Sequence, residues 1–82
     1  MFYIIVVIAY VLINCDMGSE GSIIDELRSI VGVKNVYGVF GAYDVIVEVQ
    51  TPTVDKLRET ITMTIRKIPG VRTTLTLMAV EY

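Results

Sequence analysis

Residues 30–33 read Ile-Val-Gly-Val, and residues 68–71 repeat this segment as Ile-Pro-Gly-Val. Self-similarity at a fixed spacing indicates two copies of one supersecondary unit. The same spacing brings further apolar residues into register, Ile23 with Ile61 and Leu27 with Ile65. Each half of the chain is therefore predicted to contain a strand, a helix, a stop marked by glycine and a second strand.

The first helix is expected to begin near Ser22, where Ser22-x-x-Asp25 resembles a capping box, and to end at Gly32. The second is expected to have Thr51 as its N-cap and Pro52 at its first position, and to end before Pro69-Gly70. Apolar residues at helical spacing form one stripe on each helix. The stripes are Ile23, Ile24, Leu27, Ile30 and Val31 in the first helix, and Val54, Leu57, Ile61, Ile65 and Ile68 in the second.

Four segments have the composition of strands: residues 9–13, 34–40, 44–50 and 72–80, the middle two joined by the hairpin loop Gly41-Ala42-Tyr43. Two βαβ units of this length make an α+β, ferredoxin-like βαββαβ fold. Both helices then cover one face of a four-stranded antiparallel sheet, because βαβ crossovers are right-handed.

The other face of this sheet, here called the uncovered face, has no helix on it. We expect it to carry Tyr10, Leu12, Ile46, Thr74, Thr76, Met78 and Val80. The 82-residue chain is 54% hydrophobic, only 20% charged, and has a mean hydropathy of +0.64. A typical soluble domain is about 45–50% apolar even with glycine counted, so apolar surface remains after the core is filled. The sequence predicts a homo-oligomer whose interface includes Tyr10, Leu12, Ile46, Met78 and Val80.

The N-terminal segment Met1–Ile13 is apolar throughout. A transmembrane helix needs about 20 such residues. A signal peptide needs a basic residue ahead of its apolar segment, and the first basic residue of this chain is Arg28. Because isoleucine, valine and tyrosine dominate the segment, a β-strand is the preferred interpretation, with no membrane association.

Several functional classes are disfavoured by the composition. The net charge is −2 and the lysines and arginines are scattered, which argues against nucleic-acid binding. There is no histidine and Cys15 is the only cysteine, so the common zinc sites, the Ser-His-Asp triad and an intrachain disulfide are excluded. We expect a cytoplasmic protein without metal or cofactor that binds or assembles and does not catalyse a reaction.

Two motifs resemble those of the Lrp/AsnC transcriptional regulators. Gly41-Ala42-Tyr43-Asp44, followed by Val45-Ile46-Val47, resembles the G-x-Y-D-hydrophobic hairpin of that family. Ile68-Pro69-Gly70-Val71-x-x-Thr74-x-Thr76 is similar to its [IL]-P-G-V-x-x-T-x-T segment. The resemblance extends from about Ala9 to Val80 and matches the C-terminal ligand-binding, or RAM, domain of these regulators.

This resemblance implies a dimeric αβ-sandwich, often assembled into tetramers or octamers, that binds an amino acid between neighbouring subunits. The ligand-binding residues that it suggests are Gly41, Tyr43, Asp44, Thr74 and Thr76. Asp44 would pair with the ammonium group, and the threonine hydroxyls would donate to the carboxylate. Residues 1–82 would form a single RAM-like domain without the helix-turn-helix of full-length regulators. Any effect on transcription would then be indirect, for example by co-assembly with such a regulator.

Two alternatives stay open. One is a ligand-free structural oligomeriser or partner subunit. The other is a small enzyme of the dimeric αβ-barrel kind, with Tyr10, Asp44 or Glu48 as its only candidate catalytic groups. Asp44 also has a purely structural interpretation, as a turn residue that bonds its own backbone.

Overall fold

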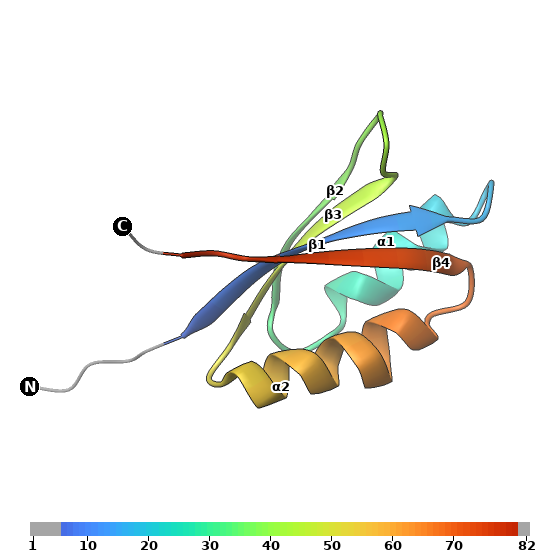
Figure 1. Ribbon diagram of the computed structural model, residues 1–82. Helices are drawn as coiled ribbons and strands as arrows, with labels where there is room; N and C mark the ends of the chain where they lie inside the picture. Colours follow the sequence, from blue (N-terminus) through green and yellow to red (C-terminus); the bar gives the residue numbers. More distant parts are fainter. Residues whose placement is uncertain (1–5, 81–82) are drawn as a thin grey trace, which may run out of the picture.

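A computed structural model describes residues 6–80 and shows two layers, a four-stranded antiparallel sheet with helices against one face (Figure 1). Along the chain the elements are β1 (Val7–Cys15), α1 (Glu20–Arg28), β2 (Val33–Gly38), β3 (Val45–Thr51), α2 (Val54–Glu59), η1 (Thr60–Thr64), η2 (Ile65–Lys67) and β4 (Val71–Met78). The segments η1 and η2 continue α2 as a π-helical and a 3₁₀-helical turn. The spatial strand order β2-β3-β1-β4 confirms the predicted ferredoxin-like βαββαβ fold.

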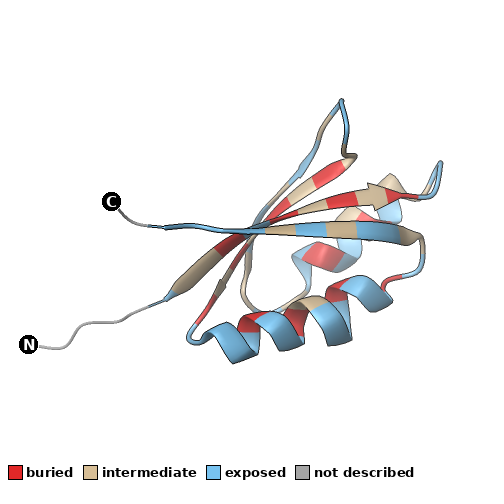
Figure 2. Ribbon diagram, in the orientation of Figure 1, coloured by how far each residue is buried: buried red, intermediate tan, exposed pale blue. Residues whose placement is uncertain are grey.

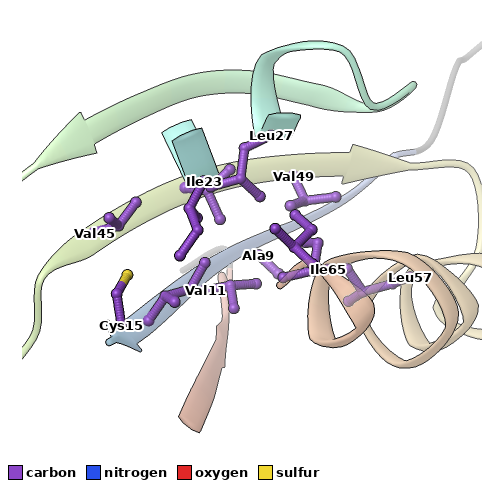
Figure 3. Close-up of a cluster of buried hydrophobic side chains, with 12 residues drawn as sticks. Ala9, Val11, Cys15, Ile23, Leu27, Val45, Val49, Leu57 and Ile65 are labelled. Carbon is purple, nitrogen blue, oxygen red and sulfur yellow. The ribbon is translucent and has the colours of Figure 1, made fainter. Parts of the chain in front are cut away.

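The core lies between the sheet and the helices. Buried residues alternate along β1 and β3 and recur on the helix surfaces that face them (Figure 2). Their side chains point toward one another (Figure 3). The core residues are Ala9, Val11, Ile13, Cys15, Ile23, Leu27, Val45, Val47, Val49, Leu57, Ile65 and Ile68. Among residues 6–80 no helix lies on the opposite face of the sheet, as predicted.

Helix α1 begins at Glu20, earlier than the capping-box pattern predicts. Its N-cap is Ser19, and Ser22 lies inside the helix, where its Oγ donates a 3.1 Å hydrogen bond to the Ser19 carbonyl. The predicted capping box is therefore wrong. The helix also ends at Arg28, so the predicted stripe extends too far, and Val31 is 90% exposed.

Gly32 is needed for a close backbone contact as well as for its conformation. Its φ is +97°, which L side chains rarely adopt, and a Cβ at this position would lie 2.9 Å from the carbonyl oxygen of Gln50. The Gln50 N–H donates a 2.8 Å hydrogen bond to the Gly32 carbonyl. The glycine that closes the first half of the repeat thus also fixes the α1–β2 connection against β3.

Helix α2 begins at Val54, and its N-cap is Thr53, whose Oγ1 accepts a 3.0 Å hydrogen bond from the Lys56 N–H. The prediction of Thr51 as N-cap is wrong, because Thr51 is the last residue of β3 and Thr53 is still extended. Leu57, Ile65 and Ile68 are buried as predicted, Ile61 packs against the core, and Val54 is 43% exposed.

The register between β1 and β4 corrects one prediction about the uncovered face. Residues on opposite positions of paired strands share a face, and three β4 residues pair with core residues of β1: Thr74 with Ile13, Thr76 with Val11 and Met78 with Ala9. Thr74, Thr76 and Met78 therefore lie on the helix-covered face, and their predicted place on the uncovered face is wrong. Val80 follows β4 outside the sheet and is 68% exposed.

Candidate functional site

The uncovered face is apolar over β1, β4 and part of β2 and β3. Cross-strand pairs bring six large side chains together on it: Tyr10 with Leu77, Leu12 with Leu75 and Ile46, and Ile46 with Tyr37. Four of them are strongly exposed in the single chain, Tyr10 by 41%, Tyr37 by 56%, Leu75 by 45% and Leu77 by 51%. A contiguous apolar surface of this kind on a small protein marks an interaction site.

The sequence identified Tyr10, Leu12 and Ile46 on this face but missed Tyr37, Leu75 and Leu77. On β4, leucines alternate with threonines, and alternation shows that two faces exist without showing which one the helices cover. Only the pairing with β1 decides it. For Tyr37 the available signal was a large aromatic residue within the predicted strand 34–40. The structure pairs it with Ile46.

Glu48 lies on the uncovered face between Tyr10 of β1 and Asn35 of β2. Its Oε2 accepts a 2.8 Å hydrogen bond from the Gln50 amide, and its Oε1 accepts one of 3.0 Å from the Asn35 amide. The bond from Gln50, followed by that from Asn35, lowers the pKa of Glu48 below its ordinary value of 4.5. Since a lowered pKa makes a carboxylate a weaker base, this environment does not favour a general base.

The environment of Glu48 predicts a pH dependence of stability. Because its pKa is lower in the folded chain, the ionised carboxylate stabilises the fold above about pH 4.5 and loses this contribution as the pH falls through the folded pKa. Urea unfolding between about pH 7 and pH 3 should therefore show a smaller acid-induced loss of stability in Glu48→Gln than in the parent protein. Glu26→Gln, on the exposed side of α1, controls for the loss of one charge. If the free energy of unfolding falls with pH by the same amount in the parent and in Glu48→Gln, the stabilising role of the ionised Glu48 carboxylate is contradicted.

Asp44 anchors the β2–β3 hairpin to the end of β1. Its Oδ2 accepts a 2.8 Å hydrogen bond from the Cys15 N–H, and its own N–H donates one of 2.9 Å to the Ile13 carbonyl. Its carbonyl accepts a 2.9 Å bond from Val39 within the hairpin. The side chain therefore bonds to another strand, which differs from the predicted turn contact to its own backbone. Oδ1 makes no hydrogen bond to the described residues.

The tip of the hairpin lies at the top of Figure 1. It carries an aromatic side chain that the sequence analysis did not single out. Phe40 is fully exposed, and Gly41 follows it with a φ of +137°. A Cβ on Gly41 would meet no atom within 4 Å, so in one subunit this glycine serves the backbone conformation. Tyr43 is partly buried.

A groove of 460 Å³ separates β4 from the helical segment formed by α2, η1 and η2. The segment and the strand run alongside each other in Figure 1. It is lined by Val54, Leu57, Arg58, Ile61, Thr62, Arg66, Thr74, Thr76 and Met78. The structure thus brings Thr74 and Thr76 together in this groove, but Gly41, Tyr43 and Asp44 do not line it. Thr74 and Val45 both pair with Ile13, so two strand spacings, about 10 Å, lie between β4 and the base of the hairpin.

Cys15 is buried at the end of β1, where burial first and the charges of Asp44, Glu20 and Asp16 next raise the pKa of its thiol. A raised pKa disfavours the reactive thiolate. Residues 6–80 contain no group of three histidine, cysteine or acidic side chains placed to hold a metal ion. Within the same residues, none of the helices has the length and apolar character to cross a membrane.

The chain is similar to several solved structures. It is 38% identical to FFRP-DM1, with a TM-score of 0.87 over 90% of this chain and 99% of the other. It is 37% identical to the hypothetical protein PHS023 from Pyrococcus horikoshii, with a TM-score of 0.86 over 93% and 92% of the two chains. The transcriptional regulator NMB0573 from Neisseria meningitidis, solved as a complex with L-Met, shares the fold at 10% identity, with a TM-score of 0.81 over 92% of this chain and 50% of the other.

A search among curated proteins finds no significant match. The family model of the Lrp/AsnC ligand binding domain matches residues 8–81, nearly the whole chain, including both motifs quoted above. The match agrees with the βαββαβ topology and with the two similar chains of nearly equal length. The chain therefore belongs to the family of Lrp/AsnC ligand-binding domains.

Proposed function

We propose that this protein is a small-molecule-sensing assembly module, which dimerises through the uncovered face and binds an amino acid where the hairpin meets a neighbouring subunit. It acts in the cytoplasm, on transcription or metabolism, through its state of assembly and not through catalysis. The observation that carries the proposal is the apolar uncovered face with Tyr10, Tyr37, Leu75 and Leu77 exposed.

Dimerisation is supported by the chemistry of this face. Two sheets that pack face to face lie about 10 Å apart and interdigitate their inner side chains. A two-fold dimer uses the same patch on both copies, and stable interfaces bury about 800 Å² on each partner. The tyrosines and leucines of β1, β2 and β4, together with Ile46 of β3, supply a patch of the required kind. Further association into tetramers or octamers would use surfaces outside this face, of which the hairpin tip with Phe40 is the most exposed apolar one.

Amino-acid binding is supported by the hairpin. Asp44 is fixed through Oδ2 by the Cys15 N–H, which holds Oδ1 in a defined position for a bond from an ammonium group. Phe40 is fully exposed on the same hairpin, where it would supply an apolar wall once a second subunit covers the loop. A regulator of the same fold has been solved as a complex with L-Met. Binding between subunits would couple to assembly, because a ligand that contacts two chains favours the state in which both are present.

A thermal-shift screen against the twenty amino acids tests the binding half of the proposal. A ligand at 100 times its Kd that binds only the folded assembly adds about 2.7 kcal/mol. In a domain of this size each kcal/mol raises Tm by about 4–8 °C, so a true effector shifts Tm by about 10 °C or more. Size-exclusion chromatography of any hit shows whether assembly responds. A flat screen on a folded dimer would refute amino-acid sensing and leave the structural oligomeriser or partner subunit as the better account.

A further inference from the structure

We infer that the groove between α2–η2 and β4 is a binding site for an aliphatic carboxylate that lacks an α-ammonium group. One chain forms the whole groove, and the inference does not rest on the proposed sensing of amino acids at the hairpin. The volume of the groove, 460 Å³, lies within the range of about 300–1,000 Å³ typical of small-molecule sites.

The helical wall of the groove is cationic. Arg58, Thr62 and Arg66 all line it. In a regular α-helix, residues eight positions apart are rotated by about 80° from each other, because each residue turns the helix by about 100°. The π-helical turn η1 is wider and lies between the two arginines, which removes part of this rotation. Thr62 lies in this turn and its Oγ1 donates to the Arg58 carbonyl. The wide turn therefore brings Arg58 and Arg66 to the same side of the helical segment, where both line the groove.

The strand wall supplies hydroxyl groups, and the interior of the groove is apolar. Thr74 and Thr76 stand on the helix-covered face of β4, with Met78 next along the same face. The apolar lining on the helical side includes Leu57, which is buried, and Ile61, which packs against the core. A ligand that fits this arrangement has a head group that accepts hydrogen bonds from guanidinium and hydroxyl donors, and an aliphatic tail.

The charges favour a carboxylate without an ammonium group. Arg58 pairs with Asp55 at 3.7 Å, but the two side chains are 74% and 95% exposed, so the pair is weak and easily exchanged. Arg66 forms no ion pair within the described residues. Among residues 6–80 no acidic side chain lines the groove, so an ammonium group there would face two cations without a carboxylate from its lining. A simple fatty acid or a 2-oxo acid fits these charges better than the corresponding amino acid.

The test is a titration of the whole protein with octanoate. Calorimetry measures its affinity and stoichiometry, and methyl NMR shows which residues it contacts. We expect one octanoate per chain, with shifts at Met78 and the groove threonines, and no saturable binding of octylamine. Arg66→Gln should weaken octanoate binding by about tenfold or more, the loss of one charge-assisted hydrogen bond, and Arg66→Lys should retain part of it. Arg28→Gln removes one exposed charge at the end of α1 and should leave the affinity unchanged.

Three outcomes would overturn the inference: no saturable shift with octanoate, equal binding of octylamine, or shifts confined to the uncovered face. Failure of the proposed dimerisation can be told apart from failure of this inference. Leu77 lies on the opposite face from the groove, so Leu77→Glu should still bind octanoate, whether it is monomeric or dimeric.

Discussion

Leu77→Glu is expected to convert the protein into a monomer. Leu77 lies on the edge strand β4, pairs with Tyr10 on the apolar uncovered face and is 51% exposed in the single chain. In a two-fold dimer the substitution would bury two unpaired carboxylates, one from each copy, at a cost of several kcal/mol for each charge. We expect the dimer dissociation constant to rise by about 100-fold or more, measured by sedimentation velocity over a range of concentrations.

The matched control is Val31→Glu. Val31 is 90% exposed at the turn after α1, so the same change of residue type there should leave the state of assembly unaltered. Because Leu77 is already half exposed, Leu77→Glu should fold as a single chain, which circular dichroism would verify. A Leu77→Glu protein that remains a dimer with the affinity of the parent would place the interface elsewhere and refute the role of the uncovered face.

Asp44→Asn is expected to abolish amino-acid binding while preserving the fold. An asparagine retains a side-chain oxygen that can accept the hydrogen bond from the Cys15 N–H, but it loses the negative charge that pairs with an ammonium group. Asp44→Ala removes both. It leaves the Cys15 N–H without its acceptor, which should cost about 1–3 kcal/mol of stability. The thermal shift given by an effector should disappear in Asp44→Asn, and the Tm of the protein alone should fall mainly in Asp44→Ala.

This pair of variants separates the two roles of Asp44. If Asp44→Asn shows the full ligand-induced shift, the proposed ammonium contact is wrong and the side chain serves only to hold the hairpin. If both variants lose the same stability without ligand, the hydrogen bond from Cys15 depends on the charge of the carboxylate. In that case, the ligand-induced rise in Tm must be measured for each variant from the Tm of that same variant without ligand.

The fold could be predicted from the sequence because the chain repeats. The glycines that end the two halves, Gly32 and Gly70, have φ values of +97° and +95°. Two residues ahead of them, Ile30 packs against the core and Ile68 is part of it. The helix starts were less accurate. At Thr51 and at Ser22 a plausible capping residue lay close to the true N-cap, and only the tertiary course of the strand or loop decides which residue is used.

Which residues share a face or a groove was predicted less well, for reasons of pairing and distance. The face of β4 that carries Leu75 and Leu77 depends on its register with β1, which no local pattern contains. The bond between Asp44 and Cys15 joins residues far apart in the chain. Thr74 and Thr76 were grouped with Asp44 through a family motif, whereas the structure places them in a separate groove together with Arg58 and Arg66. In the sequence these arginines are two of the scattered basic residues, and no local pattern shows that they line one groove.

Native mass spectrometry of the purified protein, with and without an amino acid that raises its Tm, tests the central claim most directly, since it reports assembly and bound ligand together. The account predicts assemblies with an even number of chains, carrying the amino acid in a fixed ratio to those chains, and Leu77→Glu monomers that carry none. A folded monomer, or an assembly that never carries an amino acid, would contradict it.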